Sequence, residues 1–145
     1  IVIPKTVKEI AGAAFLFCYS LKSIVLPDSI TAIGTWMFYD CTSLASVVIP
    51  DSVTAIDAEA FSGCTALTSI TIPNCVAKID DEAFFGCTSL TNIVISGNVT
   101  EIRQKAFDSI SPNAHFTVIS ESVKRLILDS GSNVRDEQIT VDVNL

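Results

Sequence analysis

The chain has 145 residues, of which 49% are hydrophobic and 17% charged, and its formal net charge is −7. This composition is typical of one soluble domain with an extended core, and no apolar run reaches the length that crosses a membrane. The negative charge and the absence of a Lys/Arg cluster argue against nucleic acid or an anionic membrane as the main partner, because both need a basic surface.

The first residues, Ile1 to Pro4, match the middle of a unit that recurs further along the chain. Ile1 is also not a start methionine. We therefore expect further repeats before Ile1 in a longer protein. The absence of a signal peptide here leaves the compartment open, because such a segment is removed from the mature protein.

One set of residues recurs every 23 positions along most of the chain. It consists of one proline, one isoleucine, one phenylalanine, one cysteine and one leucine in each unit. Their positions are Pro4, Pro27, Pro50 and Pro73; Ile10, Ile33, Ile56, Ile79 and Ile102; Phe15, Phe38, Phe61 and Phe84; Cys18, Cys41, Cys64 and Cys87; and Leu21, Leu44, Leu67 and Leu90. A period in the twenties, carried by apolar residues, is typical of a stacked solenoid.

Each unit predicts a strand followed by a return segment. Residues 67–72 place apolar side chains on one face, and this pattern indicates a short strand that Pro73 ends. Residues 76–84 carry apolar side chains at helical or 3₁₀-like spacing, so we expect a turn-like helix on the opposite flank. The predicted fold class is an α/β repeat solenoid, with a parallel sheet on one face and short helical turns on the other. A single unit buries too little apolar surface to fold alone, so the coils must stack.

The repeat pattern fades towards the C-terminus. Residues 1–115 comprise five repeats, the first truncated at its N-terminus, and residues 116–145 are expected to form a capping strand, helix and strand. The helix is predicted over 121–130, with Ser120 as N-cap and Gly131 as terminator. Alternating Ile139, Val141 and Val143 predict the last strand. Such a segment would cover the open end of the stack.

Five cysteines raise the question of disulfides or metal. Side chains at equivalent places in stacked coils run parallel and do not converge as a disulfide requires. Zinc is disfavoured because there is no C-x-x-C pair and His115 is the only histidine. We expect the four repeated cysteines to be buried thiols that donate to backbone carbonyls. Cys75 stands outside this set and is either a reactive thiol or a tolerated small side chain.

The unit written from Leu67 to Cys87 resembles the BspA-like class of leucine-rich repeat proteins, which share its I-x-I-P strand and A-F-x-x-C turn. The resemblance covers Ile1 to about Ser111, and residues 120–145 also look like the ending of many such chains. It implies a right-handed leucine-rich repeat coil whose sheet lines the concave face. It also implies a large secreted or surface-attached protein of bacteria or some protozoa, associated with adhesion. It does not imply a ligand.

Two groups of residues are candidates for binding. The first comprises the small residues expected to face out of the sheet, which form a smooth surface able to receive a protein segment or a glycan of a host or neighbouring cell. They are Ser23, Val25, Ser46, Val48, Ser69, Thr71, Asn92 and Val94. The alternative is that such residues simply suit strands. The second group is Trp36, Tyr39 and Phe85, which form either an interface or packing between turns.

Acidic residues also cluster in two successive units. They are Asp57, Glu59, Asp80, Asp81 and Glu82. Stacked carboxylates can hold Ca²⁺, but Arg103 and Lys105 occupy the same places one unit later, which favours charge pairing on a solvated face.

Catalytic motifs are missing from this sequence. His115 has no nucleophile motif nearby and there is no Gly-rich phosphate loop. We therefore expect no enzyme, no metal and no cofactor.

Three hypotheses of function follow. The first is an extracellular binding or adhesion module that uses its sheet face. The second is a structural spacer with no ligand of its own. The third is an intracellular interaction scaffold, which unpaired thiols favour and a signal peptide upstream of Ile1 would exclude.

Overall fold

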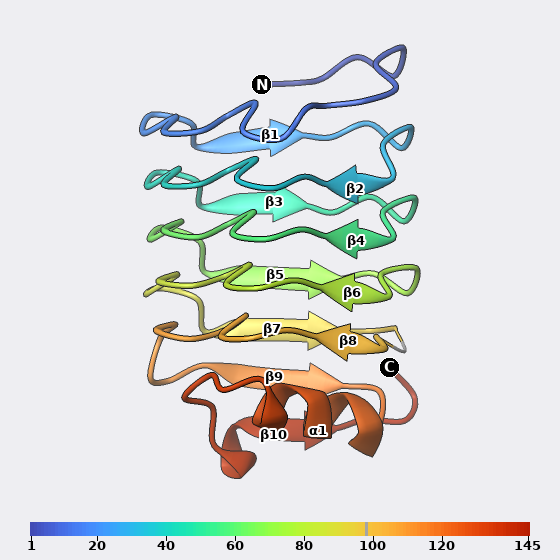
Figure 1. Cartoon of the computed structure of the whole chain (residues 1–145), viewed down its shortest axis with the longest axis vertical. Coiled ribbons are helices and arrows are strands. Elements are labelled where there is room, and N and C mark those ends of the chain that lie inside the picture. The colour runs from blue at the N-terminus through green and yellow to red at the C-terminus, as the bar shows by residue number, and fades with distance from the viewer. Residues whose placement is uncertain (98) are drawn as a thin grey trace.

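The computed structural model describes residues 1–97 and 99–145, and its coils stack one above another (Figure 1). One strand of each coil lies on the same side of the stack. These strands are β1 (Ser23–Val25), β3 (Ser46–Val48), β5 (Ser69–Ile72), β7 (Asn92–Ile95) and β9 (His115–Val118). The return path of each coil holds a shorter strand. These are β2 (Ala32–Ile33), β4 (Ala55–Ile56), β6 (Lys78–Ile79) and β8 (Glu101–Ile102).

All strand pairs are parallel and share one register. Ser23 lies opposite Ser46 and Asn92 opposite His115, an offset of one repeat in each case. The longer strands form two hydrogen-bonded sheets, β1-β3 and β5-β7-β9-β10, and the short strands form one, β2-β4-β6-β8. The single sheet expected on the first face is therefore divided between β3 and β5. The alternation of exposed and buried residues is the same on both sides of this division.

The prediction of helical turns on the return path is wrong. The residues between β4 and β5, for example, form turns that are stabilised by hydrogen bonds to the next coil. In the equivalent turn one coil earlier, the N–H groups of Trp36, Phe38 and Asp40 donate to carbonyls of the following coil at 2.8 to 3.2 Å. Met37 and Tyr39 instead donate to carbonyls three residues back. Left-handed backbone at Trp36 (φ 55°) and Asp40 (φ 53°) accompanies this alternation. A helix would satisfy its N–H groups within itself.

A column of phenylalanine rings runs through the core on this flank. Phe38 and Phe61 are fully buried, and each ring lies over the ring of the next coil. The centroid distances from Phe15 through Phe107 are 5.2 to 5.4 Å, with interplanar angles of at most 13°. Phe116 of β9 ends the column with an edge-on contact at 5.1 Å. The column therefore joins every repeat to its neighbours through the core.

The stack ends in a helix and a strand (Figure 1). α1 spans Glu121–Asp129, and Ser120 accepts a hydrogen bond from the N–H of Val123 as its N-cap. A 3₁₀ turn, η1 (Asp136–Gln138), leads into β10 (Ile139–Val141), which pairs with β9 at the same 23-residue offset. Val143, expected in this strand, is exposed and lies beyond it. The role of this segment as a cap stays a prediction.

Replacing Phe61 by Ala is expected to lower the free energy of unfolding by about 3 to 5 kcal/mol, because it leaves a cavity between two stacked rings. Chemical denaturation followed by circular dichroism measures this loss. Tyr19→Ala, which removes an exposed ring, is the control and should change stability by less than about 0.5 kcal/mol. A loss below about 1 kcal/mol for Phe61→Ala would show that the column contributes little.

Removing residues 120–145 is expected to produce self-association, because it exposes the hydrogen-bonding edge of β9 and the apolar end of the core. Size-exclusion chromatography with light scattering measures the outcome. A protein lacking only residues 142–145 keeps β10 and should remain as dispersed as the parent chain. A stable, non-associating truncation to residue 119 would contradict a capping role.

Candidate functional site

The structure places all eight predicted sheet residues on the outer face of the longer strands. Ser23, Ser46, Ser69 and Asn92 form one row of exposed side chains, and Val25, Val48, Thr71 and Val94 form a second. Val94 is half-buried and the other seven are exposed. The side chains between the two rows, such as Ile24 and Ile70, point into the core. The placement agrees with the expected alternation, whereas binding by these residues is not tested by it.

Both rows are longer than the sequence predicted. Val2 bridges to Val25 at the first end, and His115 and Thr117 continue the rows on β9. Thr140 of β10 follows Thr117, and its hydroxyl lies 2.9 Å from Nε2 of His115. The 23-residue period of the sequence places all four of these residues, Val2, His115, Thr117 and Thr140, in the two rows. It was hardest to see at Thr140, because α1 interrupts the repeat pattern before it.

The second row begins with three exposed valines in register. The exposed fractions of Val2, Val25 and Val48 are 72%, 57% and 78%. Val25 and Val48 line a groove of about 610 Å³ together with the prolines that end these strands. Its other lining residues include Ile3, Pro4, Lys5, Pro27, Asp28 and Pro50. Side-chain hydroxyls of the serine row lie beside this apolar surface, so the face offers apolar contact and hydrogen bonds together.

The second candidate group is not one cluster. Trp36 is exposed and its Nε1 donates to Oε1 of Glu59 at 3.1 Å. Tyr39 is half-buried and meets the ring of Phe17 edge-on, with centroids 5.8 Å apart. Phe85 is half-buried, and in the described part of the chain no ring contact joins it to the others.

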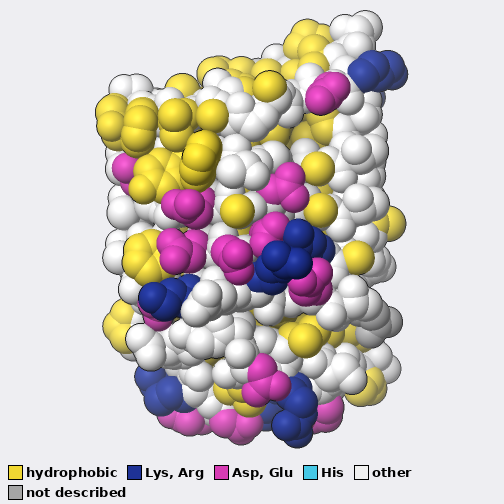
Figure 2. Space-filling model, viewed as in Figure 1, with side chains coloured by type: hydrophobic (Ala, Val, Ile, Leu, Met, Phe, Trp, Pro, Cys, Tyr) yellow, Lys and Arg dark blue, Asp and Glu magenta, His cyan; other side chains and the backbone are white. Residues whose placement is uncertain are grey.

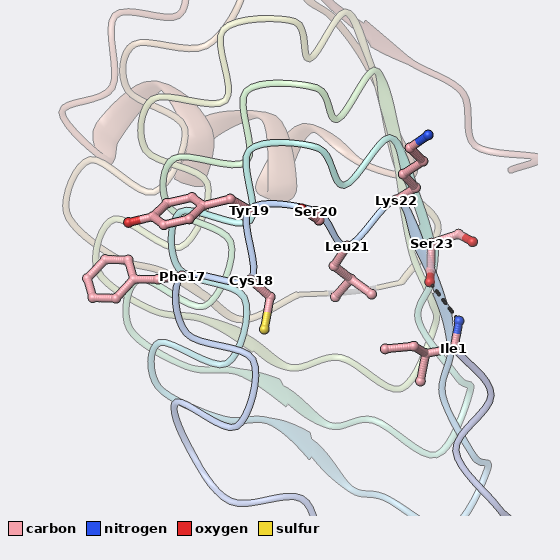
Figure 3. Close-up of a pocket in the computed structure, with 8 residues that line it drawn as sticks. All are labelled: Ile1, Phe17, Cys18, Tyr19, Ser20, Leu21, Lys22 and Ser23. Carbon is pink, nitrogen blue, oxygen red and sulfur yellow. Dashed lines mark hydrogen bonds between the residues drawn. The ribbon is translucent and has the colours of Figure 1, made fainter.

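Two further aromatic residues belong with Tyr39. The rings of Phe17 and Tyr19 stack with centroids 6.0 Å apart, and both side chains are exposed. They line a groove of about 670 Å³ at the N-terminal end of the stack. Figure 3 shows these two rings pointing away from the coil, whereas Leu21 points inward and Ser23 lies on the strand side. The sequence signal for Phe17 was its place in the repeat, which Gly63 and Gly86 occupy later.

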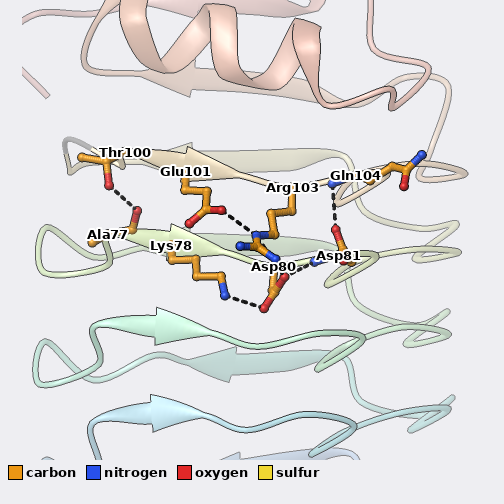
Figure 4. A network of polar contacts seen from close by, with 8 residues as sticks. All are labelled: Ala77, Lys78, Asp80, Asp81, Thr100, Glu101, Arg103 and Gln104. Atoms are coloured by element: carbon orange, nitrogen blue, oxygen red, sulfur yellow. Dashed lines mark hydrogen bonds and ion pairs between the residues drawn. The ribbon is translucent and has the colours of Figure 1, made fainter.

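Of the clustered acidic residues, Asp80 forms ion pairs, one within its own coil and one with the next coil (Figure 4). Nζ of Lys78 lies 2.7 Å from Asp80, and Nε of Arg103 lies 3.6 Å from Asp80 and 2.5 Å from Glu101. Burial alone would raise the pKa of Asp80, but hydrogen bonds and the two cations hold this pKa below its usual value. The predicted charge pairing is confirmed for Arg103.

Lys105, expected to pair similarly, takes part in none of the ion pairs of residues 1–97 and 99–145. Over the same residues, no three metal-ligating side chains come together, so the calcium alternative gains no support. No helix among them is long and apolar enough to cross a bilayer. That the chain is no enzyme and needs no cofactor stays a prediction.

Three of the four repeated cysteines are buried thiols, as predicted. The Sγ atoms of Cys41, Cys64 and Cys87 each lie 3.1 Å from the carbonyl oxygen of a phenylalanine in the preceding coil and donate to it. Burial raises the pKa of all three thiols, to about 11 for Cys41 and about 12 for Cys87. Cys18 is half-buried, Cys75 is exposed, and all five cysteines are free.

Comparison with known proteins identifies the repeat. A family model described as "BspA type Leucine rich repeat region" matches residues 1–125 in six copies. No curated protein matches the chain. The chain is similar to the crystal structure of a leucine-rich repeat protein from Bacteroides ovatus, at 34% identity and a TM-score of 0.70. This match covers 81% of the present chain and 30% of the B. ovatus chain.

Two other solved structures are also similar. The leucine-rich repeat protein of T. pallidum matches at 33% identity and a TM-score of 0.74, over 81% of this chain and 56% of that one. The pneumococcal vaccine antigen PcpA shares the fold, at 24% identity and a TM-score of 0.71, over 98% of this chain and 41% of the antigen. The chain thus spans about a third to a little over half of the relatives from B. ovatus and T. pallidum.

The thiols give a test of this arrangement. At pH 7.5 we expect a thiol-reactive dye to modify Cys75 first, because it is exposed, and to leave Cys41, Cys64 and Cys87 unmodified until the chain unfolds. Mass spectrometry of the labelled peptides measures the order of modification. In a Cys75→Ser variant the fast phase should disappear. Equal rates at Cys75 and Cys64 would contradict the buried ladder.

The same thiols predict a loss of stability at high pH. The pKa of Cys41 is raised in the folded chain from 9.0 to about 11. Stability from this protonated thiol is therefore fully present below pH 9 and is lost as the pH rises from 9 to about 11. Denaturation midpoints measured at pH 8, 9, 10 and 11 should fall across this window, and a Cys41→Ala variant should show a smaller decline.

Proposed function

Because this chain belongs to the BspA-type leucine-rich repeat family, we propose that it is a binding module of a secreted or cell-surface protein. The proposed site is the outer face of β1, β3, β5 and β7. Its ligand is a protein segment or a glycan of a host or neighbouring cell. Leucine-rich repeat proteins generally act as binding modules, and their recognition residues lie at the variable places of the repeat.

The observation that carries the proposal is the row of exposed valines. Val2, Val25 and Val48 lie side by side in register, and each exposes more than half of its surface. Single exposed apolar residues are ordinary on protein surfaces, whereas a contiguous apolar row rimmed by polar residues is typical of an interaction site. The fold does not require valine here, because Thr71 occupies the same place in the next coil.

The rows define what kind of contact a ligand can make. β7 is hydrogen-bonded to a strand on each side, and β3 and β5, which end their sheets, face each other within the stack. A ligand on the outer face therefore meets side chains first. Ser23, Ser46 and Ser69 present hydroxyls about 4.8 Å apart along the stack, and Asn92 presents an amide at the next place. A ligand that spans several coils would therefore bury the valine methyl groups and bond to successive hydroxyls.

The spacer hypothesis is favoured by a different observation. The column of stacked phenylalanines and the constant register make the chain a continuous rod of equivalent coils. A rod of this kind can hold another module away from a surface without a ligand of its own. The two functions differ in whether the outer face of the strands needs its particular residues.

The test is a binding assay of the chain against immobilised extracellular-matrix proteins, mucins and glycans. We expect saturable binding by the parent chain and a loss of at least about tenfold in the Val48→Glu, Thr71→Glu double variant, because both charges would be buried against the ligand. Both side chains are exposed in the free chain, so the variant should fold. Circular dichroism and the denaturation midpoint verify this.

The matched control is a Thr31→Glu, Thr54→Glu double variant. It adds the same charge in adjacent coils at exposed places outside the two rows. It should bind as the parent chain does. Absence of binding by the parent chain would contradict the proposal and favour the spacer, and equal losses in the two double variants would place the effect in net charge instead of the face.

A further inference from the structure

Exposed aromatic side chains gather on the turns that precede β1 and β3. Phe17 and Tyr19 expose 47% and 56% of their surface, and Trp36 exposes 45%. Tyr39 connects them, because its ring contacts Phe17 and its N–H donates to the carbonyl of Trp36 at 3.2 Å. Figure 2 shows hydrophobic side chains gathered on this upper flank with acidic side chains directly beneath them.

The backbone beneath these side chains is held in an unfavourable conformation. Phe17 has φ 57° and Trp36 has φ 55°, in the left-handed region that costs residues with a Cβ atom free energy. Gly63 and Gly86 occupy the place of Phe17 in later coils, where the same turn carries no such cost. The left-handed backbone recurs at Ala13, Glu82 and Lys105, so it belongs to the turn of every coil, and what sets the first coil apart is the large exposed ring at the place of Phe17.

Two carboxylates complete this surface. Glu59 accepts the hydrogen bond of the Trp36 indole, and this contact holds the carboxylate against the ring. The side chain of Asp40 lies over Gly63, where a Cβ atom would fall 1.9 Å from its Oδ1. We define the aromatic-acidic patch by its six residues, Phe17, Tyr19, Trp36, Tyr39, Asp40 and Glu59.

The negative charge of the patch is not neutralised within the described part of the chain. The ion pairs of residues 1–97 and 99–145 join other residues, and none contains Asp40 or Glu59. The pKa of Tyr39 is raised, first by burial and then by the negative charges of Asp40, Glu59 and Glu82. The N–H of Asp40 also donates to the carbonyl of Ser62 at 2.8 Å, so Asp40 and Glu59 lie on adjacent turns of neighbouring coils.

We propose that the aromatic-acidic patch binds a cationic segment of a partner protein, with a Lys or Arg side chain against the Trp36 ring and its charge facing Glu59 and Asp40. Cations are attracted to the faces of aromatic rings, most strongly to Trp, and an adjacent carboxylate adds a charge-assisted hydrogen bond. Arginine also stacks its planar guanidinium on such rings. The uncompensated carboxylates favour a cationic segment over a neutral glycan. The patch lies outside the serine and valine rows, so this site is additional to the proposed function.

The test uses a dye-labelled peptide, Gly-Arg-Gly-Arg-Gly, whose binding to the whole chain is followed by fluorescence anisotropy. The comparison peptide contains citrulline, a neutral isostere, in place of both arginines. We expect saturable binding of the arginine peptide and binding about tenfold weaker for the citrulline peptide. Trp36 is the only tryptophan of the chain, so its fluorescence reports contact at the patch directly.

Two variants locate the site. Trp36→Ala should weaken binding about tenfold, and it should fold because Ala13 has the same place and the same left-handed backbone one coil earlier. Glu59→Gln removes the charge but keeps an acceptor for the indole, and it should also weaken binding. Glu101→Gln is the matched control, because it removes one negative charge from the pair with Arg103 and should leave binding within about twofold.

Three outcomes would overturn the proposal. The first is an equal loss in Glu59→Gln and Glu101→Gln, which would make binding a matter of net charge. The second is equal affinity for the arginine and citrulline peptides. The third is quenching of Trp36 by neutral oligosaccharides without any binding of the arginine peptide. Retention of peptide binding by the Val48→Glu, Thr71→Glu variant supports a separate site, whatever that variant does to the ligand of the strand face.

Discussion

Hydrogen bonding between neighbouring coils is the constraint on which this structure depends. The longer strands, the short return strands and the turns all place backbone N–H groups on carbonyls of an adjacent coil. A buried N–H group without a partner costs free energy, so no coil is stable by itself. The single register of 23 residues follows, because any other offset would move the phenylalanines and cysteines out of their columns.

The sequence predicted the strands and the core well, because alternating burial and a fixed period are properties of side-chain spacing. It predicted helical turns wrongly, because helices and these turns place apolar residues at similar intervals. What separates the two is the partner of each N–H group, which apolar spacing does not reveal. Trp36 and Glu59 have left-handed backbone, and their place in the other coils is held by Ala13, Glu82 and Lys105, so glycine gives no sign of it there.

The candidate surfaces differ in how far the sequence could locate them. The strand rows follow from counting in steps of 23, and even Thr140 obeys that count across an intervening helix. The contact between Phe17 and Tyr39 does not follow from that count, because it joins residues that are 22 positions apart. The contact arises because the N–H of Phe17 donates to the carbonyl of Tyr39, so the turns of neighbouring coils pair at an offset of 22 residues. Only coordinates disclose neighbours of this kind.

The constant offset of 23 residues also has a genetic consequence. Every interface between coils uses the same places of the unit, so an in-frame duplication or deletion of one unit of coding DNA joins surfaces that already fit. Such an event changes the length of the rod by one strand spacing, about 4.8 Å, without a new type of contact. The length of the rod can therefore change in evolution while the fold stays the same. Recombination between units can also exchange exposed residues while the core remains intact.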